Sequence, residues 1–220
     1  MHWRAGKIVL LLLLAAAVAP WPAGLAAQEA PPEDARFTAR DAHQGVTIAA
    51  RPLVDAAEAE ALFGKGAAPV RAGLLAVEML IINDRGESIF INLGRITLLR
   101  KGDKFEPVSP AEAALLLYPP PEGSSPNLGP QPLPLPRRSP LPKDKKHAAR
   151  EEAEAALRSR RFRTHTVPPA GRARGFLYFD LGETDAELTQ MQLYIPEVND
   201  AETNDGLLFF EIALAPPQKP

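Results

Sequence analysis

The chain has 220 residues, of which 45% are hydrophobic and 24% are charged, and its formal net charge is −2. This length and hydrophobic content are enough for one sizeable domain with a packed core. The sequence has no cysteine, which excludes disulfide bonds, a cysteine nucleophile, a thiolate zinc site and a lipid anchor on cysteine.

The first 27 residues predict a secretory signal peptide. Arg4 and Lys7 give a positively charged start, and an apolar run follows at 8–18. That run is too short to span a bilayer comfortably, and the small residues at 23–27 suit cleavage. We therefore expect a periplasmic or secreted protein, with a retained N-terminal membrane anchor as the open alternative.

Cleavage would remove two basic residues and no acidic ones. The 25 basic and 27 acidic residues of the chain would become 23 and 27, a net charge of −4. This balance is not typical of a protein that binds nucleic acid. No transmembrane span is expected after cleavage.

The stretch at 73–99 predicts three short β-strands. Apolar residues occupy both sets of alternate positions along 75–82, with Glu78 as the exception, so both faces of this strand should be covered, as in a central strand. Turn residues then lead into strands at 88–92 and 96–99. Short strands separated by frequent turns are typical of a sandwich or barrel. Four more strands are expected, at 45–51, 175–181, 188–195 and 206–214.

Two short helices are expected beside these strands. Asp55 is a suitable N-cap for the first, and Gly64 is a suitable C-terminal stop. Ser109 and Glu112 form a capping-box pattern at the start of the second, and the prolines at 119–121 must end it.

Residues 119–174 are predicted to interrupt the sheet. Ten of the 24 residues at 119–142 are proline, so this segment should be an extended, solvated spacer. A charged helix is expected at 143–162 and a linker at 168–174. The two halves of the sheet should then pair across the insertion, because a long insertion costs little closure entropy once its ends are held together.

Positive charge gathers in this insertion, with ten basic and four acidic residues between 137 and 163. One interpretation is a basic arm that contacts an anionic surface. The other is a solvated helix that covers an edge of the sheet, and alanines on its less charged face favour this second interpretation. The first gives a set of candidate interaction residues, namely Arg137, Arg138, Lys143, Lys145, Lys146, Arg158, Arg160 and Arg161.

Three groups of residues resemble an immunoglobulin-like module of the kind that recurs in uncharacterised exported bacterial proteins. They are FGKGAAPVRAGLLAVEMLIIND, ITLLRKGDKFEPVSPAEAA, and the late pair GFLYFDL and LLFFEIAL. The resemblance spans about 46–113 and 175–214 and consists of core positions, turns and a Ser-Pro helix start. It implies a β-sandwich and export, and it transfers no functional residue.

The expected fold is therefore mainly all-β, an immunoglobulin-like sandwich of about seven strands with short helices and a proline-rich, helical insertion. The sandwich domain should span 45–214 and be interrupted at 119–174. A flexible lead-in at 28–44 should precede it, and a tail at 215–220 should follow.

An acidic segment near the C-terminus is a candidate metal site. Asp200, Glu202, Asn204 and Glu211 resemble the ligands of a calcium-binding loop, although the glycine falls one position late for its sharp turn. A hairpin turn at 204–206 explains the same residues. The hairpin is the favoured interpretation, and no cofactor is expected.

No catalytic motif is recognisable in the sequence, and the three histidines beyond residue 27 lack motif partners. We expect a non-enzymatic binding or structural module of the bacterial cell envelope, whose partner is another envelope protein or an anionic envelope surface. Two alternatives stay open. One is a membrane-anchored accessory subunit. The other is an envelope glycan hydrolase with a carboxylate pair, formed by Asp180 or Glu183 together with Asp185 or Glu187.

Overall fold

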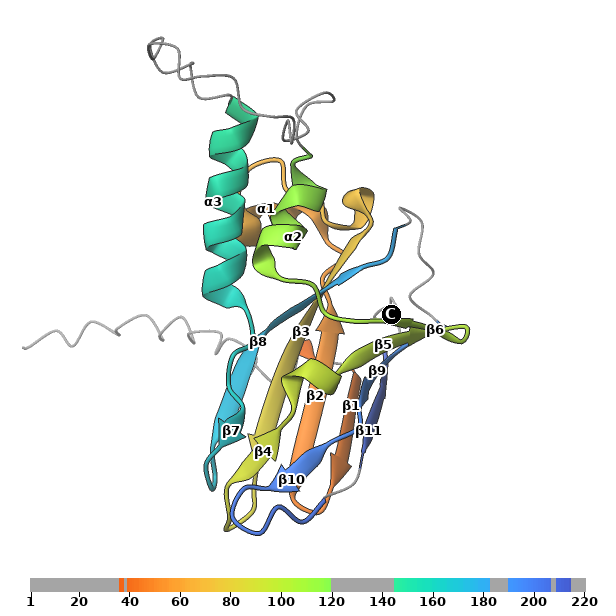
Figure 1. Ribbon diagram of the computed structural model, residues 1–220, viewed down its shortest axis with the longest axis vertical. Coiled ribbons are helices and arrows are strands. Elements are labelled where there is room, and N and C mark those ends of the chain that lie inside the picture. The colour runs from red at the N-terminus through yellow and green to blue at the C-terminus, as the bar shows by residue number, and fades with distance from the viewer. Residues whose placement is uncertain (1–35, 38, 120–144, 183–189, 207–208, 215–220) are drawn as a thin grey trace, which may run out of the picture.

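The structure is a computed structural model that describes residues 36–37, 39–119, 145–182, 190–206 and 209–214. The predicted signal peptide, the segment at 120–144 and the tail lie outside these residues. In the described part the protein is mainly β, as predicted, with three antiparallel sheets and three α-helices (Figure 1).

Eleven strands are present in the described part of the chain. They are β1 (Ala39–His43), β2 (Val46–Pro52), β3 (Leu74–Asn83), β4 (Ile89–Ile91), β5 (Thr97–Arg100), β6 (Asp103–Phe105), β7 (Thr166–Val167), β8 (Arg172–Asp180), β9 (Met191–Ile195), β10 (Val198–Asp200) and β11 (Phe210–Ala213). The helices are α1 (Ala56–Phe63), α2 (Pro110–Leu117) and α3 (Lys145–Arg160), with 3-10 turns η2 (Val70–Ala72) and η3 (Leu93–Arg95).

The largest pairing in the fold joins the two halves of the sequence. Sheet A has the strand order β1-β2-β3-β8, so β3 is a central strand, as its apolar pattern predicted. Strand β8 pairs with it antiparallel from Leu74 opposite Asp180 to Ile82 opposite Arg172. The predicted pairing across the insertion is therefore confirmed.

One face of sheet A packs against two smaller sheets. Sheet B has the order β10-β4-β7, and sheet C has the order β11-β9-β5-β6. Val77 and Met79 of β3 share a buried apolar cluster with Ile89 of sheet B and with Leu193 and Ile212 of sheet C. Alternate residues of β3 belong to this cluster because successive side chains of a strand point to opposite faces of the sheet.

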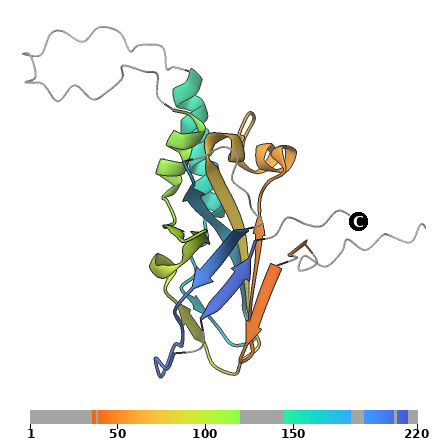
Figure 2. The ribbon, with the colours of Figure 1, turned by 90° about the vertical axis from the view of Figure 1, so that its right-hand side faces the viewer.

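The three helices lie together at one end of the molecule (Figures 1 and 2). They cover the other face of sheet A, where Phe63 of α1, Ala113 of α2 and Leu157 of α3 pack against Phe176 and Tyr178 of β8. Helix α3 thus packs on the same face as β8, the edge strand of sheet A, and both interpretations of the charged helix stay open.

The helix starts follow the sequence signals. The side chain of Ser109 accepts a hydrogen bond from the Glu112 amide, and the Glu112 carboxylate accepts one from the Ser109 amide, so the predicted capping box is confirmed. Asp55 caps α1 by accepting from the amide of Glu58 at 2.7 Å, and Gly64 ends that helix.

The prediction of about seven strands was too low because four short strands, β1, β6, β7 and β10, were not recognised. Residues 39–43, expected in a flexible lead-in, form a hairpin with β2 through Gln44 and Gly45, whose φ angles are 49° and 78°. The expected linker at 168–174 is also shorter, since β8 begins at Arg172. No helix in the described residues is long and apolar enough to cross a membrane.

Candidate functional site

Two neighbouring cavities beside the C-terminal end of α3 share Arg161 and Arg163 in their linings, and we call them together the basic groove. The first, of about 330 Å³, is lined by Leu93, Gly94, Glu106, Pro107, Arg161, Phe162, Arg163, His165 and Leu177. The second, of about 430 Å³, is lined by Ser109, Pro110, Ala111, Arg158, Arg161 and Arg163.

The first wall of the basic groove is the chain that leaves α3. Phe162 is buried and donates its amide to the carbonyl of Phe176 at 2.9 Å. Its neighbours Arg161 and Arg163 are exposed, because successive side chains of an extended chain point to opposite sides. Gly175 permits this arrangement, since a Cβ atom there would lie 2.5 Å from the Cα atom of Phe162.

The second wall is the segment between β6 and α2, and it is attached to the same strand. The amide of Val108 donates to the carbonyl of Tyr178 at 2.8 Å, and Pro107 forms a bridge with Phe179. Both walls are thus hydrogen-bonded to β8, which fixes the width of the groove between them.

The charge in the basic groove is mainly positive. Among the residues that the structure describes, three arginines line it, and Glu106 is the single acidic residue in the lining of the two cavities. Arg158 is paired with Glu154 on its own helix, and Arg163 donates to the carbonyl of Arg158. An Arg guanidinium stays charged at any physiological pH and suits bidentate binding of carboxylate or phosphate groups.

An aromatic pair borders the first cavity. His165 lines the cavity, and its ring stacks on that of Phe90 with 6.2 Å between centroids and 20° between planes. Phe90 lies in β4 and is 38% exposed, which is high for a large apolar side chain. Phe90 lines neither cavity, so the stack reaches the first cavity through the His165 ring.

The structure brings together only part of the predicted interaction set. Arg158 and Arg161 line the basic groove, whereas Arg160 is not in the lining of either cavity and donates to the Ser159 hydroxyl at 3.5 Å. Three others, Arg137, Arg138 and Lys143, lie outside the described residues. The last two, Lys145 and Lys146, begin α3, but the structure does not describe their side chains.

Sequence reasoning missed three groove residues, Glu106, Arg163 and His165. The available signal was the run RRFRTH at 160–165, in which a single aromatic residue interrupts basic ones. It indicates an extended segment anchored at Phe162 with its charges facing outward.

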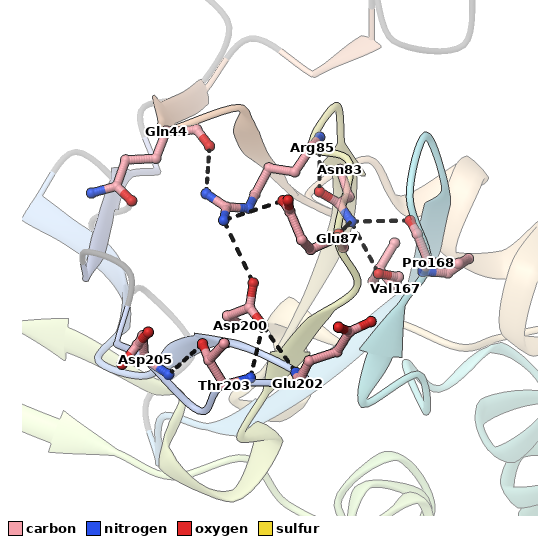
Figure 3. A network of polar contacts seen from close by, with 10 residues as sticks. All are labelled: Gln44, Asn83, Arg85, Glu87, Val167, Pro168, Asp200, Glu202, Thr203 and Asp205. Carbon is pink, nitrogen blue, oxygen red and sulfur yellow. Dashed lines mark hydrogen bonds and ion pairs between the residues drawn. The ribbon is translucent and has the colours of Figure 1, made fainter.

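The calcium candidates do not form one set of ligands. The Asp200 carboxylate accepts hydrogen bonds from the amides of Glu202 and Thr203 at 2.9 and 3.0 Å (Figure 3). These bonds lower the pKa of Asp200, and the bond from Thr203 has the largest effect. Asn204 binds the side chain of Asn199, while Glu211 lies in sheet C, away from sheet B, which contains Asp200. Among the described residues no three acidic, His or Cys side chains are placed to hold a metal ion.

The contacts around Asp200 instead connect four chain segments at one end of the sheets (Figure 3). Arg85 lies 3.6 Å from the Asp200 carboxylate and donates to the carbonyl of Gln44 at 3.3 Å. Asn83 is fully buried and donates to the carbonyls of Val167 and Pro168 at 3.1 and 3.0 Å. We call Asn83, Arg85 and Asp200, together with the groups that they bind, the loop network. Its contacts hold neighbouring segments together, so its role is structural.

A second polar cluster lies between α1 and sheet A. The buried carboxylate of Glu78 accepts from Arg51 and from Arg174, each at 2.6 Å, and Glu58 binds Arg51 with two hydrogen bonds of 2.7 and 2.8 Å. The hydrogen bond from Arg51 lowers the pKa of Glu58, and the reverse effect raises the pKa of Arg51. Two carboxylates match two guanidinium groups, so the cluster joins α1 to the sheet.

The carboxylate pair required by the hydrolase alternative lies mostly outside the described residues. Asp180 is exposed, and its carboxylate accepts from the amide of Gly182 at 2.9 Å. Its predicted partners Glu183, Asp185 and Glu187 are not among the residues that the structure describes.

Comparison with known proteins identifies no relative of established function. No protein-family model and no curated protein matches the chain. Among solved structures, it is similar to a functionally unknown protein from Listeria monocytogenes EGD-e, at 12% identity and a TM-score of 0.34 over 80% of each chain. A TM-score this low carries no inference about fold or function.

Proposed function

We propose that this protein is an exported, non-enzymatic binding module of the bacterial cell envelope, and that it holds an anionic envelope component in the basic groove. The observation that supports this is the presence of Arg158, Arg161 and Arg163 in two cavities that share two of these side chains. A recess lined by several guanidinium groups and one carboxylate attracts anions, and walls fixed to one strand need little reorganisation on binding.

At the level of fold, we propose that sheet A and the two smaller sheets form an immunoglobulin-like sandwich whose insertion carries α3. The resemblance at 63–84 and 96–114 and the shared apolar core support this reading. The location rests on residues 1–27, which have the charge and hydrophobic pattern of a signal peptide. N-terminal sequencing of the exported protein should begin at residue 27 or 28, whereas a start at Met1 would support the membrane-anchored accessory subunit.

Co-sedimentation of the purified mature protein with isolated cell envelopes tests the binding function. We expect binding at low ionic strength that weakens as salt is added, because exposed charges are screened over about 10 Å at 0.1 M salt. The double variant Arg161→Gln/Arg163→Gln should lose most of this binding.

The control is Arg71→Gln, which removes one positive charge, against two in the double variant, from an exposed residue outside both cavities. It should bind envelopes as the wild type does. Equal binding by the double variant and the wild type would refute the proposed function.

A further inference from the structure

We propose that the ligand of the basic groove is an acidic saccharide, meaning a chain of sugar rings that carry carboxylate groups. This inference rests on the proposed function and adds the chemical class of the ligand. Three features of the lining support it, and a site for a simple anion would not need all of them. They are the neighbouring arginines, a carboxylate, and apolar and aromatic side chains.

The arginines account for the negative charge of the ligand. Arg161 and Arg163 line both cavities, and Arg158 lines the second. A guanidinium binds a carboxylate through two parallel hydrogen bonds, a geometry that a point charge does not specify. Two cavities that share two arginines fit two neighbouring acidic units of one chain better than a single isolated ion.

Glu106 favours a saccharide over other polyanions as the ligand of the basic groove. An ionised carboxylate only accepts hydrogen bonds, so in the first cavity it suits a ligand that has hydroxyl donors. A polyphosphate chain has no such donors at neutral pH, and its charge would be repelled by Glu106. A sugar acid has both a carboxylate for the arginines and hydroxyl groups for Glu106.

The remaining lining offers apolar surface for sugar rings. Leu93, Pro107 and Leu177 line the first cavity, as does His165, whose ring stacks on that of Phe90. Small-molecule sites combine such apolar surface with a few placed polar groups. A lipid bilayer is a less suitable partner, since it presents a broad surface of headgroups, whereas these arginines line recesses of about 330 and 430 Å³.

Calorimetric titration of the mature protein tests this inference with four probes. They are a tetramer of galacturonic acid, the neutral tetramer maltotetraose, inorganic polyphosphate, and vesicles of phosphatidylglycerol. We expect binding of the galacturonate tetramer and none of maltotetraose. Arg161→Gln should weaken galacturonate binding by about tenfold, as expected for the loss of one charged hydrogen-bond pair, while Arg71→Gln should leave it unchanged.

A sugar ring can lie against an aromatic face and a phosphate chain cannot. Phe90→Ala tests this aromatic contribution through His165, because it removes the ring on which the His165 ring stacks. This variant should weaken binding of the galacturonate tetramer, whereas Arg71→Gln, with its aromatic pair intact, should not. Since Phe90 is already 38% exposed, the fold should tolerate the change, and circular dichroism would verify this.

Two results would overturn the inference. One is binding of polyphosphate or of phosphatidylglycerol vesicles, dependent on Arg161, without binding of the galacturonate tetramer. That outcome would leave the proposed anion-binding function intact and change only the ligand class. The other is galacturonate binding that Arg161→Gln and Arg71→Gln affect equally, which would place the ligand outside the basic groove.

Discussion

Gly175 is the residue that allows the chain after α3 to lie directly against β8. A Cβ atom at this position would lie 2.5 Å from the Cα atom and 2.6 Å from the nitrogen of Phe162, which are distances that real Cβ atoms do not show. The neighbour is backbone rather than the flexible end of a side chain. The first wall of the basic groove therefore depends on the absence of a side chain here.

We predict that Gly175→Ala lowers the free energy of unfolding by about 2 kcal/mol, as overpacking of a well-packed site does. It should also weaken ligand binding, because Arg161 and Arg163 flank the displaced Phe162. Urea denaturation and the envelope binding assay would measure the two effects. Gly86→Ala is the control, since a Cβ atom there would have no neighbour within 4 Å; equal stability of the two variants would contradict the predicted clash.

Helix α3 is held on the protein by a buried leucine and by hydrogen bonds in both of its halves. Leu157 is fully buried against the aromatic residues of β8, and its carbonyl accepts a hydrogen bond from the Tyr178 hydroxyl at 2.9 Å. At the other end, Arg150 donates to the carbonyl of Tyr118 at 2.8 Å. Burial also raises the pKa of Tyr178, which keeps this hydroxyl protonated as a donor.

Leu157→Ala should lower the free energy of unfolding by about 3 kcal/mol, as is typical of a buried leucine in a site that cannot collapse. Amide hydrogen exchange along α3 should accelerate together with this loss. Leu115→Ala on α2 removes the same atoms from a side chain that is 44% exposed, and we expect it to cost much less. Unchanged exchange in the Leu157 variant would mean that other contacts hold the helix.

At this scale the sequence predicted the elements that carry a strong apolar pattern or a helix cap, and it missed four strands of at most five residues. The apolar alternation of β3 and the capping box at Ser109 are local signals, and both were interpreted correctly. By contrast, β1 reads ARDAH, with two charged residues and no large apolar residue. It is a strand because β2 pairs with it, and such tertiary context is not visible in a short polar segment.

Across the whole molecule, the basic groove could be predicted only in part. Arg158 and Arg161 were among the interaction candidates because charge in the insertion is visible in the sequence. Glu106 and Pro107 lie more than fifty residues away along the chain, and their segment reaches the groove because Val108 and Pro107 pair with Tyr178 and Phe179 of β8. The run at 160–165 is a local signal for the first wall, but nothing local indicates that the segment at 106–109 lies beside it.

The loop network leads to a prediction about the acid stability of the whole protein. Asp200 is buried, contacts Arg85 and accepts two amide hydrogen bonds, which hold its pKa below the ordinary value of 3.8. A group whose pKa is lowered in the folded state stabilises that state above the ordinary pKa, and this stabilisation is lost as the pH falls through the lower, folded value.

Asp200→Asn should therefore lower the free energy of unfolding near neutral pH, and the difference from the wild type should shrink as the pH falls below 3.8. Urea denaturation across this pH range would measure it. Asp205→Asn is the control, since it makes the same change at an exposed position of the same loop. A constant difference for Asp200→Asn at all pH values would show that the charge of Asp200 is not what stabilises the loop network.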